Sequence, residues 1–171
     1  MKKIYIILSY SGTFPSKIIK IFTRYKYSHV SLALNDNINK MYSFGRKKVN
    51  NPFNGGFIIE TKKSSFYKKF NKTNCTIIEI EIENNKYKEL NSILNKYKKD
   101  IEIYRYDILG LFLRIFKIKI QRKNYNICTE FVASLLREAN IYNFNKKIIK
   151  PKDFLDIPNK KIIYQGKLLN Y

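Results

Sequence analysis

Two residues far apart in the chain form a pair that can do covalent chemistry: His29, the only histidine, and Cys128, one of two cysteines. A thiol that passes its proton to an imidazole becomes a nucleophile able to attack an amide or ester carbonyl. If the two side chains meet in space, the sequence predicts a cysteine hydrolase. If they do not, it predicts a basic domain without recognisable chemistry.

His29 lies in a segment, residues 28–34, that alternates in the way typical of a β-strand. Its aliphatic side chains share one face and belong to a core, whereas His29 shares the other face with Ser31 and Ala33. These small neighbours leave room for another group to pack closely against the imidazole. A polar surface with an incidental histidine would show the same pattern, so the strand alone leaves both alternatives open.

Cys128 opens a segment, residues 127–140, in which apolar side chains recur at helical spacing from Phe131 onward. A thiol in the first turn lies at the positive end of the helix dipole, which favours the thiolate. The unpaired backbone N–H groups of that turn can stabilise an oxyanion. The alternative is a small buried apolar residue, which is what we expect of Cys75.

A catalytic imidazole also needs a group that orients it, and the next strand along the chain can supply one. The residues after a turn at 35–39 predict a second strand and therefore a hairpin. A register that pairs Ala33 with Met41 puts Ser43 on the face of His29, so Ser43 is the candidate third residue. The alternatives are Tyr42 after a one-residue slip, the carboxylate of Glu60, a water or a backbone carbonyl.

The remaining pattern predicts one domain over residues 1–171, in the α+β class, with an antiparallel sheet packed against helices. The expected strands are residues 3–9, 28–34, 40–44, 57–60, 76–83 and 161–165. The expected helices are residues 15–24, 85–99, 106–117 and 127–140, and residues 50–56 are expected to form a long loop. Tyr10, Ser11 and Gly12 end the first strand and are, from their position, candidate substrate-binding residues.

The charge of the chain is extreme, with 34 Lys and Arg against 13 Asp and Glu and a formal net charge of +21. Such a charge attracts polyanions, so a nucleic acid or an anionic membrane is a candidate partner. The lysines are dispersed, however, and abundant Ile, Lys, Asn and Tyr together are typical of an A/T-rich genome. We therefore favour compositional drift and expect no specific nucleic-acid site.

Three further classes are not expected: disulfide-rich, metal-binding and membrane-spanning proteins. Two distant cysteines form no disulfide framework and, with one histidine, no usual zinc site, so no metal or cofactor is expected. The apolar stretch 108–116 is too short to span a bilayer and contains Arg114, so the expected compartment is the cytoplasm. With Lys117 and Lys119 it would also suit a helix in peripheral contact with an anionic membrane, although a core helix is the simpler interpretation.

The segments at 27–33 and 125–133 together resemble the permuted papain-fold hydrolases of the YiiX/YaeF type. These are circularly permuted relatives of the NlpC-type cell-wall peptidases, and the lecithin:retinol acyltransferase group has the same order, with histidine before cysteine. The resemblance covers nearly the whole chain and implies a circularly permuted papain-like fold. It also implies Cys128 as the nucleophile, His29 as the base and a third polar residue at or beside Ser43.

For function, the resemblance implies acyl transfer through a thioacyl-enzyme. The substrate would be an amide or ester of a small molecule, a peptide or a lipid, because amidases, peptidases, thioesterases and lipid acyltransferases all use this pair. Glu130 matches the Cys-Ser/Thr-Glu pattern of the family. It lies two residues beyond Cys128, so its side chain is expected to point away from the thiol and to be structural.

Overall fold

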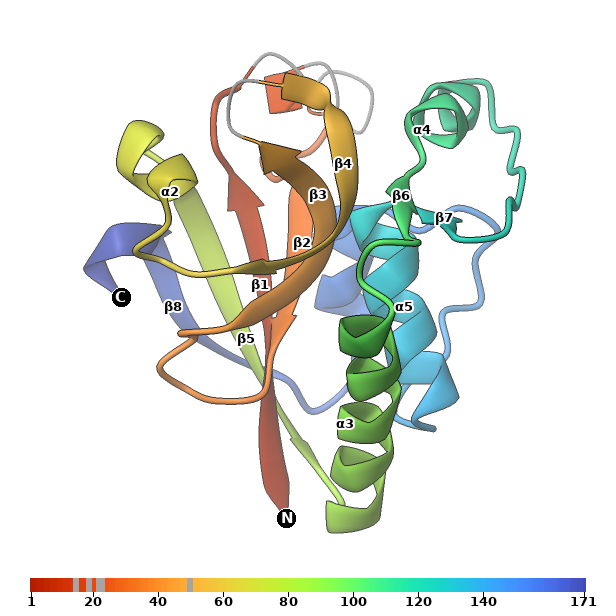
Figure 1. Ribbon diagram of the computed structural model, residues 1–171. Helices are drawn as coiled ribbons and strands as arrows, with labels where there is room; N and C mark the ends of the chain where they lie inside the picture. Colours follow the sequence, from red (N-terminus) through yellow and green to blue (C-terminus); the bar gives the residue numbers. More distant parts are fainter. Residues whose placement is uncertain (14–15, 18–19, 21–23, 49–50) are drawn as a thin grey trace.

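The computed structural model describes residues 1–13, 16–17, 20, 24–48 and 51–171. The described chain forms a six-stranded sheet in the order β4-β3-β2-β1-β5-β8, and all its strand pairs are antiparallel (Figure 1). The strands are β1 (Lys2–Tyr10), β2 (His29–Ala33), β3 (Met41–Lys48), β4 (Asn51–Glu60), β5 (Asn74–Ile82) and β8 (Lys161–Lys167). This arrangement confirms the α+β class and the antiparallel sheet.

The sheet is covered on both faces, which explains why β1 at its centre is an almost unbroken apolar run. Ile6 and Leu8 face one hydrophobic cluster, whereas Tyr5 and Ile7 face another. The larger cluster receives the apolar side of two helices, α3 (Asn84–Lys99) and α5 (Cys128–Glu138), and α5 lies along β2 (Figure 1). Side-chain alternation along each strand thus supplies two cores rather than one.

The smaller cluster, on the opposite face, is closed by two short helices. These are α2 (Ser65–Lys69), which contributes Tyr67, and the 3-10 helix η2 (Leu168–Asn170), which contributes Leu168. Ser64 caps α2 by accepting a hydrogen bond from the backbone N–H of Tyr67. The cap and the burial of Tyr67 together hold this five-residue helix on the sheet.

A second, two-stranded sheet lies between the main sheet and the remaining helix. Its strands β6 (Arg105–Tyr106) and β7 (Tyr125–Asn126) are parallel, and α4 (Ile108–Ile115) follows β6 directly. A 3-10 helix, η1 (Pro151–Asp156), adds Phe154 to the larger core. None of the helices among the described residues combines the length and apolarity that crossing a bilayer requires.

Most expected elements are present within two or three residues, but one prediction is wrong. The segment described from Asn51 onward belongs to strand β4 and not to a loop. Its Asn-Pro and Gly-Gly pairs look like loop residues, yet Gly55 and Gly56 serve close packing. A Cβ at Gly55 would lie 2.7 Å from the Cβ of Tyr106, and one at Gly56 would collide with the backbone of Tyr104. The expected helix at 15–24 lies mostly outside the described residues.

Candidate active site

His29 begins β2 and pairs with Ser9 of β1, and its side chain is 22% exposed. The expected hairpin register is confirmed, because Ala33 pairs with Met41. Met41 in turn pairs with Glu60, the last residue of β4. Residues paired directly across antiparallel strands point to the same side, so His29 and Glu60 share one face of the sheet.

Glu60 is the group that holds the imidazole. Its Oε2 lies 3.2 Å from Nε2 of His29, and only 11% of its side chain is exposed. Tyr67, presented by α2, lies near the same carboxylate, and burial and then the charge of Glu60 raise the pKa of its phenol. A carboxylate fixed by a second partner can orient a histidine and stabilise its positive charge.

Ser43, the expected orienting residue, has a different partner. It is fully buried on the predicted face, but its Oγ donates a 2.6 Å hydrogen bond to the carbonyl oxygen of Val30. The nearest backbone acceptor therefore takes the hydroxyl, and the assignment of Ser43 to the imidazole is corrected in favour of Glu60. Two residues on, a Cβ at Gly45 would lie 3.6 Å from Cε1 of His29, so β3 passes beside the ring at ordinary contact distance; the tight contact at Gly45 is with the side chain of Ile58, 2.6 Å away.

Cys128 is the first residue of α5. Its thiol lies close enough to His29 for the two side chains to interact electrostatically, and both residues line one cavity. No side chain caps the N-terminus of α5, so backbone N–H groups of its first turn stay available to a ligand. The structure thus brings together the two residues that the sequence singled out.

The pKa of His29 lies well above its usual value of 6.5, as the result of opposing effects. Burial disfavours the imidazolium ion and lowers the pKa. The charge of Glu60 and the hydrogen bonds to Cys128 and Glu60 raise it, and they outweigh the effect of burial. The raised pKa favours the imidazolium form of His29, the form that can pair with a thiolate.

Cys75, the other thiol, sits in a contrasting environment. It is fully buried in β5 within the smaller core, and burial raises its pKa to about 12. A thiol held in its protonated form is a poor nucleophile. The prediction that Cys75 is an inert core residue agrees with this placement.

The cavity has a volume of about 1260 Å³ and extends from the sheet edge to α4. Apolar side chains form much of its wall, and the basic side chains of Arg46, Lys47 and Arg114 also line it. Ser11 is on the described lining, whereas Tyr10 and Gly12 are not, and substrate binding by Ser11 stays a prediction. Tyr10 instead packs beneath the ammonium of Lys20, 4.7 Å from its ring centre.

Two tyrosines belong to the site although the sequence gave no reason to choose them. Tyr67 contacts Glu60 from α2, a helix too short to show a periodic pattern. Tyr106 lines the cavity, and both its burial and the charge of Cys128 raise its pKa. A phenol held protonated beside the thiol can donate a hydrogen bond there. The Ser64 cap of α2 is the one local signal that could have located Tyr67.

No model of a known protein family matches the chain, and no curated protein matches it either.

The single histidine allows a direct test of the role of Glu60. In Glu60→Gln the pKa of His29 should fall, because the neutral amide no longer favours the imidazolium; the pH titration of the lone His Cε1–H resonance by NMR measures it. In Ser43→Ala the pKa should stay as in the wild type. Because folding raises this pKa, protonated His29 stabilises the fold below pH 6.5, and that contribution disappears as pH rises through the folded-state pKa. An unchanged titration in Glu60→Gln would contradict the assignment.

Proposed function

We propose that this protein is a cysteine hydrolase or acyltransferase that cleaves an amide or ester through a thioacyl-enzyme at Cys128. The observation that carries the proposal is the chain of contacts from Cys128 to His29 to Glu60 at the wall of a large cavity. Nucleophile, base and orienting carboxylate come from α5, β2 and β4. Three groups with these roles, in contact and beside open space, are what nucleophilic acyl transfer requires.

In the proposed reaction His29 holds the proton of Cys128, and the thiolate attacks the carbonyl carbon of the substrate. The carbon–nitrogen or carbon–oxygen bond then breaks, and the imidazolium gives its proton to the leaving group. Water attacks the thioester, His29 accepts the proton of that water, and the sulfur leaves to regenerate the dyad. Where another acceptor replaces water, the same steps transfer the acyl group.

The negative charge that develops on the carbonyl oxygen needs hydrogen-bond donors. The first turn of α5 supplies backbone N–H groups beside Cys128, and the phenol of Tyr106 is a further donor near the thiol. Donors fixed before the reaction stabilise the oxyanion without reorganisation. Thr129 also lines the cavity, and its hydroxyl is buried without a partner among the described residues.

The order of the elements supports a circularly permuted papain-like fold. The histidine strand β2 precedes the cysteine helix α5, and α5 packs against the sheet that carries the histidine. This is the order that the permuted papain-fold hydrolases require. Two observations therefore support this proposed fold: the sequence resemblance and the packing of α5 on β2.

Two other functions are possible in principle: lipid acyltransfer at a membrane and nucleic-acid binding without catalysis. An apolar cavity wall favours a substrate with an acyl chain, so lipid acyltransfer or thioester hydrolysis at an anionic membrane is the second candidate. A non-catalytic nucleic-acid module would rest on net charge alone. Such a module would not explain why Cys128 and His29 lie together at a cavity.

Thiol alkylation tests the proposal without knowledge of the substrate. Iodoacetamide should modify Cys128 faster than Cys75, and His29→Ala should slow the reaction at Cys128 alone, because the imidazolium stabilises the thiolate. Peptide mass spectrometry separates the two sites. Equal rates at both cysteines in the folded protein, or a rate at Cys128 that is unaffected by His29→Ala, would refute an activated thiol.

A further inference from the structure

Helix α4 presents its apolar face to solvent. Leu109, Phe112 and Phe116 lie three and four residues apart, on one side of the helix, and are 52%, 51% and 72% exposed. Ile118, just beyond the helix, is 49% exposed. An amphipathic helix in a globular protein ordinarily buries this side. We call these four residues the α4 stripe.

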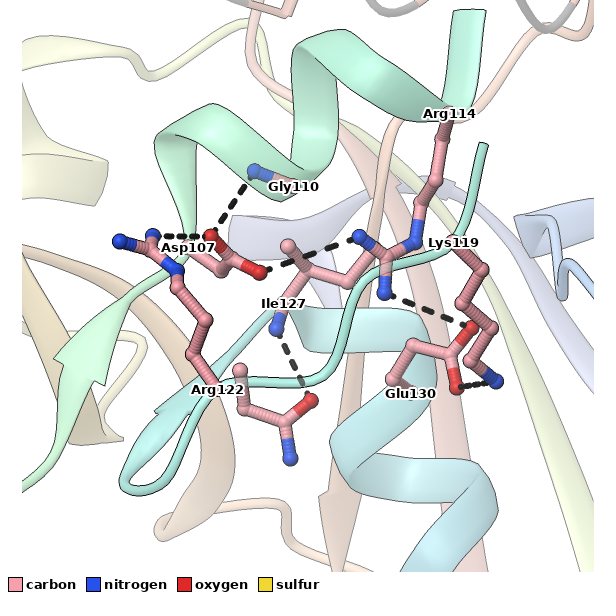
Figure 2. Close-up of polar contacts among 8 residues, drawn as sticks. Asp107, Gly110, Arg114, Lys119, Arg122, Ile127 and Glu130 are labelled. Carbon is pink, nitrogen blue, oxygen red and sulfur yellow. Dashed lines mark hydrogen bonds and ion pairs between the residues drawn. The ribbon is translucent and has the colours of Figure 1, made fainter. Parts of the chain in front are cut away.

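The opposite, inward side of α4 is held by charge. Asp107 accepts a 2.8 Å hydrogen bond from the N–H of Gly110, and its other oxygen lies 3.9 Å from the guanidinium of Arg114 (Figure 2). Arg114 also lies 3.8 Å from Glu130 of α5. A Cβ at position 110 would collide with the carboxylate of Asp107, so glycine is required for this approach. Polar contacts thus fix which side of α4 faces the protein.

The chain after α4 is tied down by the same two carboxylates. Arg122 forms an ion pair with Asp107, and Nζ of Lys119 lies 2.8 Å from Glu130 (Figure 2). Glu130 points to these cations, as expected of a structural residue. Burying charge costs free energy that an apolar contact would not. The fold nevertheless uses ion pairs here and leaves the α4 stripe outside.

We propose that the α4 stripe docks on a membrane surface rich in anionic lipids. Leucine and phenylalanine suit insertion at the level of the acyl-chain boundary, and the exposed Lys117 beside them suits contact with lipid phosphates. The net charge of +21 attracts such a surface and opposes the approach of a second copy of this chain. Charge complementarity therefore selects a lipid surface over self-association.

The α4 stripe lies next to the cavity that contains Cys128, so docking would bring this cavity to the membrane. Phe112 belongs both to the stripe and to the lining of the cavity that contains Cys128, and Ile108 and Leu111 of the same helix line it too. Helix α4 stands at the edge of the molecule, beyond β6 (Figure 1). A docked α4 would set this wall of the cavity against the lipid. The docking itself does not depend on chemistry at Cys128.

Vesicle binding tests the stripe at constant net charge. The double variant Leu109→Ser/Phe116→Ser should bind vesicles of phosphatidylcholine with about 30% phosphatidylglycerol at least about tenfold more weakly than the wild type, measured by flotation. Neither residue is on the described cavity lining. The matched control is Ile162→Ser/Ile163→Ser on the edge strand β8, where the side chains are 50% and 39% exposed. It should bind as the wild type does.

Insertion into the bilayer can be measured by fluorescence. The chain contains no tryptophan, so one introduced tryptophan reports on its own position. In Phe116→Trp the fluorescence should shift to the blue on these vesicles, whereas in Ile163→Trp it should not. Equal binding by the two double variants would overturn the proposal, and so would binding that vanishes for every variant at high salt, since this indicates diffuse attraction only. A dimer in solution that the Leu109→Ser/Phe116→Ser variant abolishes would assign the stripe to a second copy instead.

Discussion

Replacing His29 with alanine is expected to slow acylation of Cys128 by about 10²–10⁴-fold, the usual contribution of a positioned acid–base group. In the proposed reaction the imidazole both holds the thiol proton and supplies the proton that the leaving group needs. A p-nitrophenyl ester is a suitable probe, because it acylates cysteine hydrolases without specific recognition. The rate of thioester formation at Cys128, followed by intact-protein mass spectrometry, measures the effect, and Cys128→Ala gives the background from lysines.

A graded series of variants separates the roles of the three groups. Glu60→Gln should acylate more slowly than the wild type but faster than His29→Ala, because the base remains while its orientation and charge are lost. Ser43→Ala should acylate at the wild-type rate, since its hydroxyl is bonded to the carbonyl of Val30. Acylation of His29→Ala at the wild-type rate would show that the imidazole takes no part. A Ser43→Ala defect equal to that of Glu60→Gln would restore Ser43 as the orienting residue.

The positions of His29 and Cys128 could be predicted because both depend on local patterns. Alternation places His29 at the start of a strand, and helical spacing places Cys128 at the start of α5. The register of Ala33 with Met41 follows from the turn between their strands. Each inference uses only neighbouring residues, which is why each agrees with the structure.

The rest of the site depends on contacts that no local pattern encodes. Glu60 reaches His29 only because β4 begins in a segment that looks like a loop and extends for ten residues. Tyr67 reaches Glu60 from a short helix fixed by packing, and Tyr106 packs closely on β4 because Gly55 has no Cβ to collide with the Cβ of Tyr106. The hydroxyl of Ser43, the residue that alternation selected, donates its hydrogen bond to the carbonyl of Val30.

The orientation of helix α4 is also set by contacts that the local sequence does not encode. The sequence predicts an apolar stripe and a charged position at Arg114, but not which side faces the protein. That choice is made by Asp107 and Glu130, one before the helix and one on α5. The simpler expectation of a core helix is therefore wrong for the outward side of α4, where Leu109 and Phe116 are exposed.

The ion pairs that orient α4 lead to the second large prediction. Asp107→Ala is expected to lower the free energy of unfolding by about 3–5 kcal/mol, as is usual when one partner of a buried ion pair is removed. Only 3% of the Asp107 side chain is exposed, and without it Arg114, 10% exposed, loses a compensating charge. The N–H of Gly110 also loses its cap. Urea unfolding followed by circular dichroism measures the change.

Two comparisons identify the cause of this loss. Asp156→Ala removes an aspartate that is 59% exposed and paired with Lys146, so it should cost no more than about 1 kcal/mol. Asp107→Ala/Arg114→Met should be more stable than Asp107→Ala alone, because the second substitution removes the uncompensated charge. Hydrogen exchange should locate the defect in Asp107→Ala, with faster exchange in α4 than in the central strand β1. A double variant less stable than Asp107→Ala would mean that Arg114 stabilises α4 by packing, and that charge does not set the orientation of the helix.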